Sequence, residues 1–211
     1  MKFFVNFLSA FRIAAAFVII PTLMFGWYWT SFVLFVLGSI SDWFDGYLAR
    51  KYNVCSKLGG VMDHIGDKLL VVNTLIMLSI VLTLVLPAFI PGFPVWLIII
   101  PVIVMIAREL YISGLREFLG TQKIEMPVPK ARFSMGKIKT TLQMVAICAL
   151  LFMMCMPKLA MFPAYAVFAS YTFFVMAYAG IIILWLALIA SLWSATQYTF
   201  TFAEKLKQIK K

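Results

Sequence analysis

Charged residues are scarce in this chain of 211 residues: they make up 12% of it, while hydrophobic residues make up 64%. An ordinary soluble domain has about 25% charged and about 45–50% apolar residues. A water-soluble fold cannot bury so much apolar surface, so the composition excludes a soluble globular protein and also a disordered or collagen-like chain.

Cysteine and histidine are also rare. The chain has three cysteines (Cys55, Cys148 and Cys155) and one histidine, and no paired spacing of these residues indicates zinc. An odd and small number of cysteines excludes a disulfide-rich secreted scaffold. The net charge of +10 is not accompanied by a nucleic-acid-binding motif, and we expect no nucleic acid partner.

Long apolar runs dominate what is present. A membrane-spanning helix needs about 20 mostly apolar residues. Six runs meet or approach that length, at about Phe3–Phe25, Tyr28–Ala49, Val61–Leu86, Val95–Phe118, Gly136–Met156 and Phe162–Phe202. The sequence therefore predicts an all-α, polytopic protein with six transmembrane helices, in one membrane domain that covers residues 1–211 and contacts membrane lipids.

The distribution of basic residues predicts the orientation, because Lys and Arg accumulate on cytoplasmic loops. The second connection carries Arg50, Lys51 and Lys57, and the fourth carries Arg116, Lys123, Lys130 and Arg132. Four lysines end the chain, whereas the remaining connections carry only Lys158. Both termini are expected in the cytoplasm.

The chain has four aspartates, Asp42, Asp45, Asp63 and Asp67, and all lie within 26 positions. Helical spacing places the first two on one face near the end of the second run, and the last two on one face near the start of the third. Carboxylates at membrane depth are costly and usually functional, and four together repel one another unless cations neutralise them. All-oxygen ligands favour Mg²⁺, Mn²⁺ or Ca²⁺, and two ions would balance four carboxylates.

Small and basic residues surround these acids. Gly46 and Ala49 follow on the face of Asp42 and Asp45, Gly59 precedes Asp63, and Arg50 stands beside them. Small side chains let a ligand approach the backbone, and cations suit a diphosphate.

The segment Asp42-x2-Asp45-Gly46-x2-Ala49-Arg50-x8-Gly59-x3-Asp63-x3-Asp67 resembles the complete signature of the CDP-alcohol phosphatidyltransferases. The resemblance implies transfer of a phosphatidyl group from a CDP-activated lipid to an alcohol, with release of CMP. It further implies that the four aspartates hold Mg²⁺ or Mn²⁺, as two ions. Asp67 would also be the catalytic base, and Gly46, Ala49, Arg50 and Gly59 would line the CDP pocket.

Two further stretches, at residues 106–117 and 136–144, are similar to bacterial phosphatidylglycerophosphate synthases, a branch of that family. This similarity implies CDP-diacylglycerol and glycerol 3-phosphate as substrates, a bacterial inner (cytoplasmic) membrane location with a cytoplasmic active site, and a homodimer. Independently, the residues suggest a cationic pocket for a phosphorylated acceptor. Its members would be Arg108, Arg116, Lys137 and Lys139.

Some alternatives stay open at this point. The acceptor could instead be inositol phosphate, phosphatidylglycerol or serine, and a divalent-cation transporter is a more distant reading of the acidic cluster. Arg12 either belongs to the site or pairs with an acid elsewhere. His64 points about 100° away from the face of Asp63 and Asp67, which disfavours it as a ligand.

Overall fold

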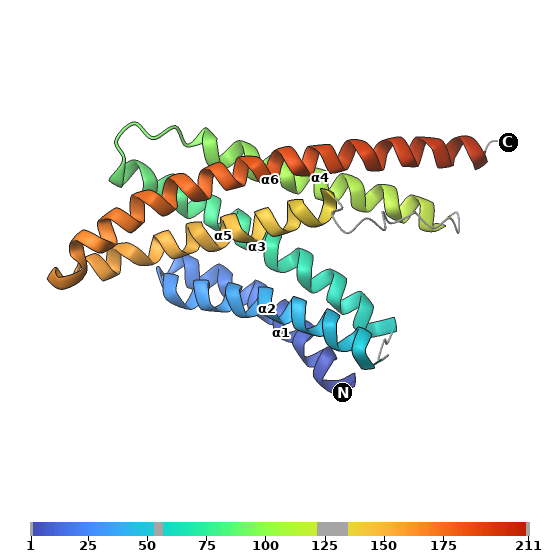
Figure 1. Cartoon of the computed structure of the whole chain (residues 1–211), viewed down its shortest axis with the longest axis horizontal. Helices are drawn as coiled ribbons and strands as arrows, with labels where there is room; N and C mark the ends of the chain where they lie inside the picture. The colour runs from blue at the N-terminus through green and yellow to red at the C-terminus, as the bar shows by residue number, and fades with distance from the viewer. Residues whose placement is uncertain (1, 53–56, 122–134, 210–211) are drawn as a thin grey trace.

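The computed structural model describes residues 2–52, 57–121 and 135–209, which are almost entirely helical and contain no strand. The elements are α1 (Lys2–Met24), α2 (Tyr28–Tyr52), α3 (Lys57–Phe89), α4 (Trp96–Thr121), α5 (Met135–Ala160), a 3₁₀ turn η1 (Pro163–Tyr165) and α6 (Ala166–Ile209) (Figure 1). The predicted all-α architecture with six long helices is confirmed.

Within the described residues, five helices are long and apolar enough to cross a membrane; they are α1 and α3 to α6. The apolar part of α2, Tyr28–Ser41, is shorter. Most side chains after Ser41 lie outside the described set, and the helix itself continues to Tyr52. At 1.5 Å per residue the 25 residues of α2 extend about 37 Å, so the helix still has the length of the roughly 30 Å hydrocarbon core.

The turn between α1 and α2 is closed by a glycine. Gly26 has φ 71°, and the backbone N–H of Trp27 donates to the carbonyl of Thr22 at 2.8 Å. This is the geometry that commonly ends a helix, and it favours glycine because other residues rarely adopt a positive φ. Lys158, near the end of α5, donates to the carbonyl of Gly26 at 2.7 Å and so ties this turn to a third helix.

Three extensive helix–helix contacts organise the molecule. α5 packs along α6, and α1 packs against both α2 and α3 (Figure 1). Close approach in the first pair requires a glycine: a Cβ at Gly180 would lie 2.7 Å from Cγ of the buried Leu150. α2 and α3 run antiparallel, as predicted, but contact one another much less than each contacts α1.

Candidate active site

The acidic motif occupies two adjoining helix ends. Asp42 and Asp45 lie in the C-terminal part of α2, and Asp63 and Asp67 lie near the start of α3. Helical backbone at these positions agrees with the predicted i,i+3 and i,i+4 spacing. The side chain of Asp67 is described by the structure.

The other members of the motif have side chains outside the described set. They are Asp42, Asp45, Gly46, Ala49, Arg50, Gly59 and Asp63, together with His64. Their predicted roles remain predictions.

Asp67 lines a small, partly open cavity between α3, α4 and α5. Its volume is about 50 Å³, with room for roughly four water molecules, which suits a small polar molecule better than a lipid chain. Its polar lining comes from Asp67 and Lys68 of α3, Glu109 of α4, and Lys139, Thr140 and Gln143 of α5. One carboxylate of the acidic motif thus shares a cavity with two lysines.

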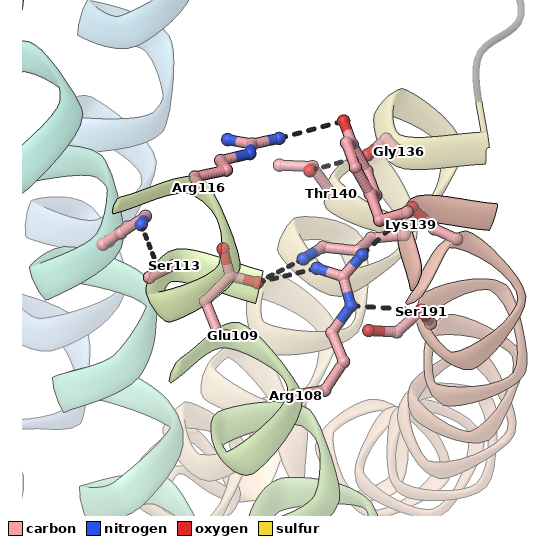
Figure 2. Close-up of polar contacts among 11 residues, drawn as sticks. Arg108, Glu109, Ser113, Arg116, Gly136, Lys139, Thr140 and Ser191 are labelled. Carbon is pink, nitrogen blue, oxygen red and sulfur yellow. Dashed lines mark hydrogen bonds and ion pairs between the residues drawn. The ribbon is translucent and has the colours of Figure 1, made fainter. Parts of the chain in front are cut away.

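Glu109 links two cations at the edge of this cavity. Its Oε2 accepts from Nη1 of Arg108 at 3.1 Å and from Nζ of Lys139 (Figure 2). The side chain of Lys139 is 10% exposed and that of Glu109 is 30% exposed. Partial burial limits solvent screening, so these pairs hold the two side chains in place more firmly than surface ion pairs would.

Arg108 is directed toward α6 and not into the cavity. Its Nε donates to the carbonyl of Ser191 at 3.1 Å and its Nη2 donates to Oγ of Ser194 at 3.0 Å. With Nη1 on Glu109, all three guanidinium nitrogens have partners in the protein. Arg108 therefore joins α4 to α6, and the structure brings it beside the predicted acceptor pocket without making it part of the cavity lining.

The other two predicted phosphate-binding cations lie further out. Arg116 donates to the hydroxyl of Tyr198 at 2.9 Å, and its guanidinium carbon is 4.9 Å from the centre of that ring. Lys137 is exposed and is not part of the cavity lining described above. Of the four predicted cations, only Lys139 lines the cavity with Asp67.

Lys68 was not predicted as an acceptor contact. It lines the cavity, and its Nζ donates to Oγ of Ser113 on α4 at 2.6 Å. Its position directly after Asp67 was the available signal, because consecutive helical residues are about 100° apart and both can border the same cavity.

Arg12 of α1 is completely buried where three helices meet. A Cβ added at Gly66 of α3 would lie 3.5 Å from its Cβ, and one added at Gly38 of α2 would lie 3.7 Å from its Cγ. Gly38 is four residues before Asp42, and Gly66 immediately precedes Asp67. Arg12 therefore sits at the base of the acidic motif, between the two helices that carry it.

The residues present fit a divalent metal by the chemistry of their donors. All four predicted ligands offer carboxylate oxygens, which hard cations such as Mg²⁺ and Mn²⁺ prefer. Among the described residues no cluster of three or more His, Cys, Asp or Glu occurs. Of the four predicted ligands, only Asp67 has a side chain that the structure describes, so the assignment of the metal ligands stays a prediction.

Comparison with known proteins tests the prediction that the chain belongs to this family. The model of the family described as CDP-alcohol phosphatidyltransferase matches residues 3–193. A Blochmanniella floridana protein is 29% identical over 211 residues, covering 97% of this chain and 93% of its own length. One from Salmonella typhimurium is 32% identical over 194 residues (90% of each chain), and one from Rickettsia bellii is 40% identical over 152 residues (69% of this chain, 72% of its own).

All three relatives are named CDP-diacylglycerol–glycerol-3-phosphate 3-phosphatidyltransferase. The predicted resemblance is thus confirmed over most of the chain: this protein belongs to the CDP-alcohol phosphatidyltransferase family.

Proposed function

We propose that this protein transfers the phosphatidyl group of CDP-diacylglycerol to glycerol 3-phosphate, giving phosphatidylglycerophosphate and CMP. The names of its relatives support both substrates. The structural observation that carries the proposal is the cavity in which Asp67 of the acidic motif meets Lys68 and Lys139. A carboxylate suits an acceptor hydroxyl, and two nearby ammonium groups suit the phosphate of the same acceptor.

In this mechanism Asp67 takes the proton of the 1-hydroxyl of glycerol 3-phosphate. The oxygen then bonds to the lipid-side phosphorus of CDP-diacylglycerol, while the bond from that phosphorus to the CMP oxygen breaks and CMP leaves with the electron pair. Lys139 and Lys68 hold the acceptor phosphate, so that its hydroxyl is directed toward α3. Arg108 supports the pocket through Glu109 and does not contact the acceptor.

Asp42, Asp45, Asp63 and Asp67 would hold Mg²⁺ or Mn²⁺, and two ions would balance the charge of four carboxylates. Bound divalent cations would offset the charge of the diphosphate and polarise the phosphorus. Gly46, Ala49, Arg50 and Gly59 would line the space for CDP. Position and residue type support these roles, since all eight residues lie on the adjoining ends of α2 and α3.

The protein is proposed to work in the bacterial inner membrane as a homodimer, with this site facing the cytoplasm. The basic residues at the α2–α3 and α4–α5 connections and at the C-terminus support this orientation. A cytoplasmic site would meet glycerol 3-phosphate, which is water-soluble, while the lipid substrate reaches it from the membrane.

The test is CMP release by purified protein given CDP-diacylglycerol and one acceptor at a time. Glycerol 3-phosphate should support turnover with Mg²⁺ or Mn²⁺, whereas serine, inositol phosphate and phosphatidylglycerol should not. Turnover with one of these three and none with glycerol 3-phosphate would overturn the proposed acceptor while leaving the family assignment intact.

A further inference from the structure

Glu109 has one carboxylate oxygen that its ion pairs do not use. Both cations bind Oε2, and the second oxygen points away from Arg108 and Lys139 (Figure 2). Glu109 also lines the cavity that contains Asp67, Lys68 and Lys139. The ion pairs therefore fix a carboxylate with one oxygen engaged and the other available to a molecule in the cavity.

Glycerol 3-phosphate presents three polar groups to such a cavity. Under the proposed function, Asp67 on α3 binds the 1-hydroxyl, and Lys139 and Lys68 bind the phosphate. The 2-hydroxyl, on the middle carbon, then needs a partner between them. Glu109 comes from α4, the helix that lies against α3 and supplies the third wall of the cavity.

Glu109 suits a hydroxyl better than the two neutral polar side chains of the lining. An ionised carboxylate only accepts hydrogen bonds, and bonds from a hydroxyl to it are stronger than those between neutral groups. The hydroxyl of Thr140 already donates to the carbonyl of Gly136 at 3.0 Å. Gln143 carries no charge, and no ion pair fixes it.

We propose that Glu109 is a specificity-determining residue that accepts a hydrogen bond from the 2-hydroxyl of glycerol 3-phosphate through Oε1. The inference rests on the proposed function and deepens it. An acceptor without this hydroxyl leaves the carboxylate oxygen without this hydrogen bond, and sites built around a substrate hydroxyl reject analogues that lack it. The pocket thus selects phosphorylated polyols over simple hydroxyalkyl phosphates.

The experiment compares glycerol 3-phosphate with 3-hydroxypropyl phosphate, which keeps the phosphate and the terminal hydroxyl but lacks the 2-hydroxyl. For the wild type, kcat/KM for CMP release should be about 10- to 100-fold lower with the second acceptor, as expected for one hydrogen bond to a charged group. Glu109→Ala should reduce this ratio to within about 3-fold, and Glu109→Gln to an intermediate value. Glu117→Gln, an exposed carboxylate on the same helix, should keep the wild-type ratio.

A role limited to holding Arg108 and Lys139 gives a different result. In that case, Glu109→Ala and Glu109→Gln lower kcat/KM for both acceptors equally and leave the ratio unchanged, which overturns the inference. Protection of each variant against thermal unfolding by either acceptor compares the affinities for the two acceptors without turnover, so an inactive variant still decides the question.

Failure of the inference is distinguishable from failure of the proposed function. A wild type that uses glycerol 3-phosphate without preferring it over 3-hydroxypropyl phosphate overturns the role of Glu109 alone. A wild type that uses neither acceptor overturns the proposed function.

Discussion

Lys137 and Lys139 are two residues apart on α5 but have different surroundings. Lys137 is exposed, whereas Lys139 is buried beside Glu109 and lines the cavity with Asp67. Substitution Lys139→Ala should raise KM for glycerol 3-phosphate by about 10- to 100-fold, since a charge-assisted bond to phosphate is lost. Steady-state kinetics with each substrate varied in turn measures this effect.

Lys137→Ala is the matched control, because it removes the same charge from the same helix. Its KM for glycerol 3-phosphate should change by no more than about 3-fold, as expected for an exposed charge. A larger increase in KM for Lys137→Ala than for Lys139→Ala would show that the acceptor phosphate binds outside the cavity.

Asp67 is the member of the acidic motif whose side chain the structure places in the cavity. Asp67→Asn should lower kcat by at least about 10³-fold, because the residue proposed as both metal ligand and base loses its charge. CMP release measures the loss, and an unchanged elution profile in detergent shows that the protein is folded. Glu204→Gln, which neutralises an exposed acid on α6, should leave kcat unaltered. A rate near that of the wild type for Asp67→Asn would remove Asp67 from the proposed mechanism.

At the residue scale, helical spacing predicted the positions of the aspartates but not the direction of each cation. Asp42 and Asp45, like Asp63 and Asp67, share a helix, so their relation depends only on local periodicity. The direction of Arg108 depends on α6, which places Ser191 and Ser194 opposite it from more than 80 positions away in sequence. No local pattern contains that register, whereas the inclusion of Lys68 in the cavity could have been inferred from its position directly after Asp67.

At the scale of helices, the apolar runs predicted all six helices. Among the described side chains α2 has a shorter apolar stretch, Tyr28–Ser41, while its helix continues to Tyr52. The contact between α1 and α3 could not be predicted in the same way, since connection length suggests neighbours in sequence and these helices are not consecutive. Gly66 permits their approach, because a Cβ there would lie 3.3 Å from the carbonyl oxygen of Ser9.

Gly180 tests the packing of α5 on α6. A Cβ at this position would lie 2.7 Å from Cγ and Cδ2 of Leu150, so Gly180→Ala should force the helices apart and cost about 1–3 kcal/mol of the free energy of unfolding. Thermal unfolding in detergent measures the change.

Gly114 on α4 supplies the comparison, because a Cβ there would meet nothing within 4 Å. Gly114→Ala should be neutral or stabilise the protein by up to about 1 kcal/mol, as alanine favours a helix over glycine. Equal unfolding temperatures for the two variants would contradict a close contact at Gly180.

At the scale of the whole molecule, the lengths and directions of the helices indicate which of their ends lie on the same side of the membrane. α6 has 44 residues and a length of about 66 Å, roughly twice the hydrocarbon core, so part of this helix exceeds the thickness of that core. Lys158 lies at the opposite end of α5 from the cavity residues Lys139 and Thr140, beside the α1–α2 turn. The cavity and the C-terminal end of α6 should therefore share one side of the membrane, and the α5–α6 turn should face the other.

Labelling of single cysteines tests this arrangement in intact bacterial cells. In a variant with Cys55, Cys148 and Cys155 replaced by alanine, Phe162→Cys places a thiol at an exposed position of the α5–α6 turn, and Glu204→Cys places one near the other end of α6. A membrane-impermeant maleimide should label Cys at position 162 in intact cells, and Cys at position 204 only after permeabilisation, because the basic ends of the protein stay in the cytoplasm. The reverse pattern would place the cavity on the outer face, where cytoplasmic glycerol 3-phosphate could not reach it, and would contradict the proposed orientation and acceptor together.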